Sequence, residues 1–345
     1  MKDGRKHKHR GSALIVVLWV VCLLSILVGS FAFDAHVEAR ITSYLRKRTK
    51  AEWLARSGLE VATLLMIEST EIKGSKTVTE KDKDDRWYDP AKRLSEGLAI
   101  RGLREKLGEG EIELDIVPEP ARRNVNRLGE KDWERILEVG GVPEEMWDEL
   151  IDCALDWIDP DETPRANGAE TDNYYGTLEQ PYHAKNGPLD TVGELLLVKG
   201  FNRTILYGGT IKTGDDEEEE PIRISGIDDL LTTYGDGKVN VNAASHRVLM
   251  TLPEADEMVA DAIIEEREGW VNENGERENT SFKDPGDLFN RVPEISPAAR
   301  ALVSTDSAVY RISSSGVVHG VRRQVWCIAE YANKNLTILR WREQD

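Results

Sequence analysis

The chain has 345 residues and a formal net charge of −18 at pH 7. This length leaves room for about two domains. The acidic balance argues against nucleic acid as a partner, because contacts to phosphate groups require Lys and Arg side chains.

The N-terminus joins a basic leader to an uncharged apolar segment. Residues 1–10 carry five Lys or Arg side chains against one Asp, and residues 13–33 carry no charge. About 20 apolar residues suffice for a membrane-spanning helix. An excess of positive charge keeps the adjacent end of such a helix in the cytoplasm. We therefore expect a single-pass inner-membrane protein whose N-terminus is cytoplasmic and whose C-terminal part lies outside that membrane.

Three interpretations of this join differ in the fate of the leader. A removable secretory signal has a shorter apolar core and an A-x-A-like cleavage site, and neither is present here. A plain uncleaved anchor fits the segment as well as a cut that precedes the apolar helix. In that third case Arg10-Gly11-Ser12 places cleavage after Gly11 and makes Ser12 the new N-terminus, which is the pattern of type IV prepilins.

The transmembrane segment, residues 12–33, is expected to continue as one amphipathic helix through residues 34–70. No proline interrupts this part of the chain. Beyond the membrane, apolar or small residues recur at steps of three and four, which marks one face of a helix. Only Arg48 breaks the series, which comprises Val37, Ile41, Tyr44, Ala51, Ala55, Gly58, Ala62 and Leu65. The helix is therefore expected to pack along a soluble domain, the alternative being a juxtamembrane coiled coil.

The rest of the chain is predicted to form an α+β fold. A short helix is expected at residues 90–106 and a strand at 111–117, with three further strands at 308–318, 322–332 and 336–341. Gly316 and Gly320 are expected to bend the chain between the first two of these three strands. A small antiparallel sheet from residues 71–117 and 307–345 would then pack on the long helix, with the helical segment 118–306 inserted.

The inserted segment contains a weak internal repeat. Asn124-Val125-Asn126 precedes predicted helices at 130–139 and 143–157, and Asn240-Val241-Asn242 precedes predicted helices at 245–252 and 255–268. Each unit resembles a helix-hairpin-helix or SAM-like motif. The second hairpin carries Glu254 and Asp256 where a DNA-binding hairpin needs glycine and a positive surface. We therefore expect these units to act as a scaffold that binds no nucleic acid.

The loop between the two units is the best candidate for a metal site. It concentrates carboxylate and amide side chains, and Ca²⁺ takes six to eight oxygen ligands in flexible geometry. Acids two residues apart in an extended loop also point the same way. The spacing does not fit an EF-hand. The predicted ligands are Asp159, Asp161, Asn167, Glu170 and Asp172, and the alternative is a solvated acidic loop without a metal.

The three cysteines and six histidines suggest no catalytic centre. Cys22 lies in the apolar segment, and Cys153 and Cys327 are expected as buried thiols, with a disulfide as the alternative in an oxidising compartment. Two histidines lie in the leader and the others are scattered singly. No H-x-x-x-H pair, nucleophile elbow or phosphate-binding loop is present. We therefore expect no enzymatic activity; a membrane-anchored hydrolase with a metal in the acidic loop is the alternative.

Several short strings, in order along essentially the whole chain, resemble the type II secretion system minor pseudopilin K family (general secretion pathway protein K). They are Arg10-Gly11-Ser12-Ala13-Leu14 with Val17-Leu18-Trp19, Trp157-Ile158-Asp159-Pro160-Asp161, Gly168-Ala169-Glu170, Pro181-Tyr182, Glu194-Leu195 with Val198-Lys199-Gly200-Phe201, and Val239-Asn240-Val241-Asn242.

The resemblance implies cleavage after Gly11 by prepilin peptidase and N-methylation of Ser12. It implies a pilin-like head, located in the periplasm, with an inserted α-domain, and structural Ca²⁺ bound by the head. It also implies assembly with the minor pseudopilins I and J, on the inner-membrane assembly platform, into a complex at the tip of the periplasmic pseudopilus. The alternative is a membrane-anchored periplasmic binding protein or a competence-type pilin-like protein.

One departure from major pilins concerns the fifth position of the mature chain. Major pilins carry Glu there, and its carboxylate can pair with the N-terminal amine of a neighbouring subunit inside the apolar filament core, where an unpaired charge is costly. Counted from Ser12, this position is Val16, followed in the same apolar helix by Trp19. A subunit at the tip has no subunit above it to pair with. The sequence therefore predicts a cap that initiates the filament.

Overall fold

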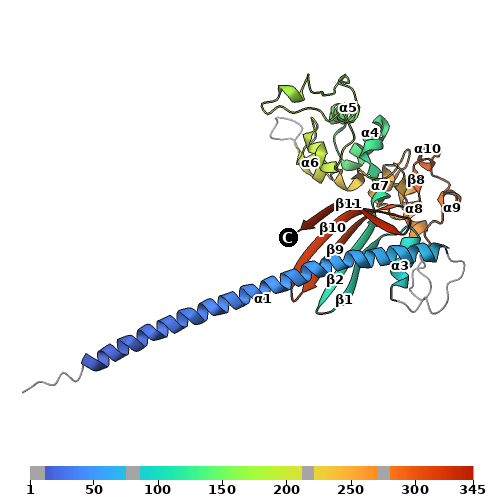
Figure 1. Cartoon of the computed structure of the whole chain (residues 1–345). Helices are drawn as coiled ribbons and strands as arrows, with labels where there is room; N and C mark the ends of the chain where they lie inside the picture. The colour runs from blue at the N-terminus through green and yellow to red at the C-terminus, as the bar shows by residue number, and fades with distance from the viewer. Residues whose placement is uncertain (1–11, 75–85, 212–220, 270–279, 345) are drawn as a thin grey trace, which may run out of the picture.

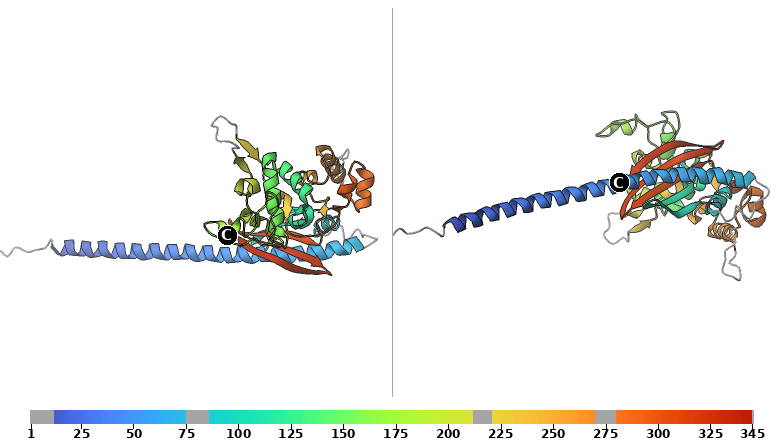
Figure 2. Two further views of the ribbon diagram at one scale, coloured as in Figure 1. Left: turned by 90° about the horizontal axis from the view of Figure 1, so that it is seen from above. Right: turned by 60° about the horizontal axis from the view of Figure 1, so that its bottom comes forward.

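The computed structural model describes residues 12–74, 86–211, 221–269 and 280–344. A long N-terminal helix, α1 (Ser12–Gly74), extends well beyond the head and then runs along it (Figures 1 and 2). Its 63 residues correspond to a length of about 95 Å. Among the described residues it is the one helix long and apolar enough to cross a membrane, and its apolar window is entirely exposed. The predicted continuous helix is confirmed and ends at Gly74 rather than near residue 70.

The C-terminal part of α1 packs on a five-stranded antiparallel sheet of order β1-β2-β9-β10-β11. The strands are β1 (Ile100–Leu107), β2 (Gly110–Pro118), β9 (Val309–Val318), β10 (Val321–Ala332) and β11 (Asn335–Gln344). The turn between β9 and β10 is His319-Gly320, and that between β10 and β11 is Asn333-Lys334; all four residues have positive φ. Such two-residue turns match the twist of paired strands and fix their register.

Small residues let α1 approach the sheet closely. Ala51, Ala55 and Ala62 are fully buried beneath it. A Cβ atom at Gly316 would lie 2.0 Å from the carbonyl oxygen of Ala51, so this position in β9 tolerates no side chain without movement of the helix. The expectation that Gly316 bends the chain between two strands was therefore wrong.

The predicted helix stripe is buried only from Ala51 onward, and Val37, Ile41 and Tyr44 remain exposed.

A second correction concerns residues 90–106. The helix α3 (Tyr88–Ser95) covers only the start of this range, and the rest forms the edge strand β1. Gly97, with a φ of 74°, follows the end of the helix. Beyond it Ile100 pairs with Ile116 and Leu103 with Leu114 of β2, the next strand along the chain, and this hairpin pairing overrides the local preference.

The inserted domain contains two consecutive helix-pair units with their own apolar core. The first comprises η1 (Glu119–Ala121), β3 (Arg123–Asn124), η2 (Val125–Arg127), α4 (Glu130–Gly140), η3 (Glu144–Met146), α5 (Trp147–Ile158), η4 (Tyr175–Thr177), η5 (Val192–Leu197), α6 (Arg203–Tyr207), β4 (Gly209–Ile211), β5 (Ile222–Ile224), η6 (Asp228–Leu230) and β6 (Leu231–Thr232). The second comprises β7 (Val239–Asn240), α7 (His246–Met250), α8 (Glu257–Glu268), α9 (Pro285–Arg291), α10 (Pro297–Arg300) and β8 (Val303–Ser304).

The internal repeat holds at the level of individual hydrogen bonds. The Asn126 side chain accepts from the backbone N–H of Leu189 (2.7 Å) and donates to its carbonyl (3.0 Å). Asn242 makes the same two bonds with Phe282, at 3.0 Å and 2.9 Å. Each unit is also closed by a short parallel strand pair, β3 with β6 and β7 with β8. The SAM-like character of the units stays a prediction.

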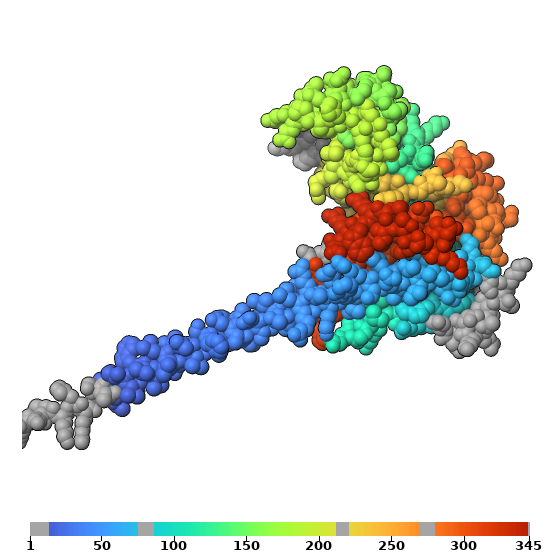
Figure 3. Space-filling view, viewed as in Figure 1, coloured from blue at the N-terminus to red at the C-terminus, as the bar shows by residue number. Residues whose placement is uncertain are grey.

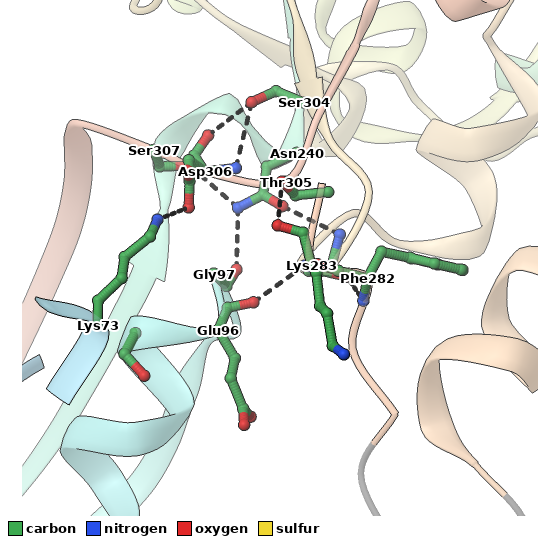
Figure 4. Close-up of polar contacts among 12 residues, drawn as sticks. Lys73, Glu96, Gly97, Asn240, Phe282, Lys283, Ser304, Thr305, Asp306 and Ser307 are labelled. Carbon is green, nitrogen blue, oxygen red and sulfur yellow. Dashed lines mark hydrogen bonds and ion pairs between the residues drawn. The ribbon is translucent and has the colours of Figure 1, made fainter. Parts of the chain in front are cut away.

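The second unit is tied directly to the head (Figure 4). The side-chain amide of Asn240 donates to the carbonyl of Gly97 (2.9 Å) and to the hydroxyl of Ser307 (3.1 Å). Lys73, at the end of α1, forms an ion pair with Asp306 at 2.5 Å. In Figure 2 the helical domain lies on the opposite side of the sheet from α1. The α+β architecture of helix, sheet and inserted helical domain is thus as predicted.

A candidate metal centre in the inserted domain

The candidate site begins where α5 ends. Asp156, in the last turn of that helix, is fully buried and accepts a hydrogen bond from the backbone N–H of Arg165 (3.1 Å). Burial raises the pKa of its carboxyl group, as does the nearby charge of Asp159. A Cβ atom at Gly168 would lie 1.9 Å from Oδ2 of Asp156, so the returning loop needs glycine at this point. These contacts fold the acidic loop back over the end of α5.

Glu170 is the most unusual side chain in the loop. It is 1% exposed, and neither carboxylate oxygen has a hydrogen-bond partner. Burial raises the pKa of this carboxyl group to about 7, and the charges of Asp156, Glu162, Asp159 and Asp161 add to the effect. A buried carboxylate without a partner is strongly disfavoured. Its observed position therefore calls for a bound proton or a cation.

Two further oxygen atoms at this site are buried without a partner, Oδ1 of Asp159 and Oδ1 of Asn186. The side-chain nitrogen of Asn186 donates to the carbonyl of Asp161 (2.9 Å) and to Oε1 of Glu162 (3.0 Å). This orients the amide and leaves its oxygen as an unused acceptor. Unpaired buried acceptors are rare in folded proteins and often mark an unseen ion or water. Carboxylate and amide oxygens together suit a hard cation such as Ca²⁺.

The predicted ligands divide into two groups. Asp159 and Glu170 carry the unpartnered buried oxygens. Asp161 is exposed, and its side chain accepts from the backbone N–H of Thr163 at 2.8 Å. Asn167 and Asp172 are also exposed, and the side-chain nitrogen of Asn167 donates to Asp152 at 3.1 Å. The structure thus favours Asp159 and Glu170 as candidate ligands over the other three.

Asn186 was not among the predicted ligands, and Glu162 belongs to the predicted acidic loop but was not named as a ligand. The only signal for Asn186 is the dipeptide Asn186-Gly187, a turn sequence in which Asn186 adopts a φ of 47°. As it stands, no group of three or more His, Cys, Asp or Glu side chains within the described ranges is arranged to hold a metal ion. The candidate centre therefore depends on the amide of Asn186 and on further oxygen donors such as main-chain carbonyls or water.

The residues assigned to processing and assembly lie at the other end of the molecule. Gly11 falls outside the described residues, and Ser12 is the first residue of α1. Val16 and Trp19 are 61% and 66% exposed on the part of α1 that projects from the head. Nothing in the described part of the chain covers them, which is expected of side chains that face lipid or neighbouring helices.

Glu170 gives a prediction for the pH dependence of stability in the absence of Ca²⁺. Its pKa is raised from an ordinary 4.5 to about 7, so the folded state holds this proton more tightly than the unfolded state. The contribution of Glu170 to stability should therefore fall as the pH rises from about 4.5 to about 7, and level off above. The difference in melting temperature between the wild type and Glu170→Gln in a chelating buffer, measured against pH, isolates this contribution. A difference that stays constant would contradict a buried, unpartnered carboxyl.

Comparison with known proteins supports the resemblance. Residues 114–207 match the family model for protein K of the type II secretion system, and this segment includes α5 and the whole loop through Asn186. Protein K of Pseudomonas aeruginosa is 27% identical over 270 residues, covering 75% of this chain and 72% of that protein. The resemblance to type II secretion system protein K is confirmed. Protein K of Klebsiella pneumoniae is 24% identical over 212 residues, a match that spans 58% of this chain and only 60% of that protein.

A solved structure supports the fold. The GspK–GspI–GspJ complex of the type 2 secretion system of enterotoxigenic Escherichia coli contains a chain that matches 90% of this one, with a TM-score of 0.56 and 14% identity. The match covers 99% of that chain. Together with the protein K relatives, the long apolar helix indicates a single-pass, membrane-anchored protein.

Proposed function

We propose that the chain is a minor pseudopilin of the type II secretion system, which joins other minor pseudopilins in a tip complex and initiates and caps the periplasmic pseudopilus for protein export across the outer membrane. The observation that carries this proposal is the continuity of α1, whose exposed apolar half becomes, without a break, the buried spine of the head. A subunit built this way can pass from the membrane into a filament of parallel helices without refolding.

The proposed partners are the minor pseudopilins I and J, with which the similar GspK chain forms the solved complex. Prepilin peptidase would cleave after Gly11, and the methylated Ser12 would then begin α1. The inner-membrane assembly platform would receive the processed subunit. In this proposal the leader is cytoplasmic and the head lies in the periplasm, as the basic leader favours.

Two features support a place at the tip. The inserted domain adds a large lobe to the head, which would obstruct a subunit stacked above it (Figure 1). Val16 stands where a shaft subunit needs a carboxylate for its neighbour's amine. The protein would act structurally, without catalysis, and Ca²⁺ bound by Asp159, Glu170 and Asn186 would stabilise the lobe by neutralising buried carboxylates.

The first test is the N-terminal peptide of the membrane-extracted protein, determined by mass spectrometry with prepilin peptidase present and absent. We expect a peptidase-dependent terminus at methylated Ser12. An intact leader in both samples would overturn the pilin-type role and leave a static membrane-anchored protein.

The second test concerns position in the filament. Val16→Glu restores the carboxylate of a shaft subunit, but the inserted domain remains, so the variant should still be found only at the tip. This result would show that the missing carboxylate at position 16 is not what confines the protein to the tip. Labelling of assembled pseudopili shows whether the wild type and the variant lie at the tip or along the shaft. Wild-type protein found along the shaft would contradict the capping role.

A further inference from the structure

The C-terminal strand β11 is an open edge of the sheet. Among the described strands only β10 pairs with it, so about half of its backbone N–H and C=O groups point outward. Its Ile338, Leu339 and Trp341 are 49%, 45% and 39% exposed. In Figure 3 the C-terminal strands form an uncovered surface between α1 and the lobe of the inserted domain. Natural proteins usually protect such edges with charge or cover them.

The opposite edge shows what protection looks like in this protein. Strand β1 carries Arg101, Arg104 and Lys106, and its pairing is interrupted by a bulge between Ile100 and Leu103. Its edge thus resists pairing with another strand. Strand β11 also has a bulge, at Leu339, and carries Arg340 and Arg342, but it combines them with the exposed apolar side chains named above. The asymmetry between the two edges points to a binding role for β11.

A second copy of this chain does not fit the open edge. A symmetric β11–β11 pair has its twofold axis normal to the sheet. Because α1 lies flat on the sheet, that axis would reverse the second α1, and the two apolar segments could not enter one membrane. Pairing of β11 with β1 of a second copy would place Arg340 and Arg342 against a strand with three basic side chains and one acid, Glu105. Like charges opposite each other destabilise strand pairs.

We propose that β11 binds, by strand addition, an acidic edge strand of a different pilin-like subunit whose anchoring helix runs parallel to α1. Main-chain hydrogen bonds supply affinity in this mode, and side chains at alternate positions supply specificity. Asp or Glu side chains of the partner lie opposite Arg340 and Arg342, and apolar side chains of the partner cover Leu339 and Trp341. The inference rests on the proposed function, since it takes the partner to be minor pseudopilin I or J.

The test uses the full chain in detergent micelles with full-length minor pseudopilins I and J of its own secretion system. Hydrogen–deuterium exchange of β11 is compared between the free chain and the complex. We expect outward-facing amides of β11 to exchange at least about tenfold more slowly in the complex. The double variant Arg340→Glu/Arg342→Glu should bind at least about tenfold more weakly, and the wild-type affinity should fall with added salt.

The matched control is Arg101→Glu/Lys106→Glu, which makes the same change in net charge at the opposite edge. It should bind within about twofold of the wild type, and circular dichroism should show both double variants folded. A wild-type complex that leaves exchange in β11 unchanged, or equal binding by both double variants, overturns the strand-addition proposal alone. Failure of the wild type to bind I and J overturns the proposed function as well.

Discussion

Glu170→Gln should abolish the stabilisation of the inserted domain by Ca²⁺. In the wild type, Ca²⁺ at about one hundred times its dissociation constant should stabilise the fold by about 2.7 kcal/mol. The variant keeps the shape of the side chain but loses the charge that the cation neutralises. In a chelating buffer at pH 8 the sign reverses: the variant should be more stable than the wild type, because it carries no buried, unpartnered carboxylate. Thermal melting with Ca²⁺ and with chelator measures both effects.

Asp172→Asn provides the control in the same loop. Asp172 is exposed, so its variant should melt as the wild type does, with and without Ca²⁺. Loss of the Ca²⁺ response in Asp172→Asn but not in Glu170→Gln would place the metal at the outer rim of the loop, as the sequence pattern allows, and would contradict the buried centre. If Ca²⁺ does not change the melting temperature of the wild type, the loop is a solvated acidic surface without a metal.

Gly316→Val should destabilise the head by at least about 3 kcal/mol. The new Cβ would meet the carbonyl oxygen of Ala51 at 2.0 Å and the backbone nitrogen of Ala55 at 2.7 Å. Both are main-chain atoms of α1, so no side-chain rotation relieves the clash and the helix must move off the sheet. Chemical denaturation followed by near-ultraviolet circular dichroism reports this loss.

Ser313→Val is the matched comparison on the same strand. Ser313 lies on the opposite face of β9, where its hydroxyl accepts a hydrogen bond from Gln324 at 2.7 Å. Its replacement should cost only about 1 kcal/mol. Equal stability of the Gly316 variant and the wild type would show that α1 does not rest on β9 at this point.

The parts of the fold that the sequence predicted are those encoded by local patterns. The uninterrupted apolar and amphipathic periodicity encodes α1, and alternation with tight turns encodes the C-terminal hairpins. Strand β1 was not predicted, because its apolar residues recur at steps of three and four, as in a helix. These residues are Ile100, Leu103 and Leu107. Only its pairing with β2 makes it a strand, and that pairing is not visible in the segment itself.

The metal site stays a prediction, and the structure shows only which side chains of the loop carry buried oxygens without a partner. The density of acids located the loop, yet which acids turn inward depends on how the loop folds over α5. Asn167 was predicted as a ligand, but it is exposed, and its side-chain nitrogen donates to Asp152. Asn186 lies in a later part of the chain, and only the fold brings its side chain to Asp161 and Glu162.

The position of the inserted domain between β2 and β9 also sets the order in which the molecule folds. Pro118 and Tyr310 are neighbours across the sheet, although residues 119–309 lie between them. Closing so long a loop in a disordered chain costs conformational entropy. This cost arises before the strand pair contributes any stabilisation. Collapse of the inserted domain around its own core brings the two ends together and removes most of that cost. We therefore expect the sheet to be completed last, so that a slow step in the inserted domain would delay folding of the whole head.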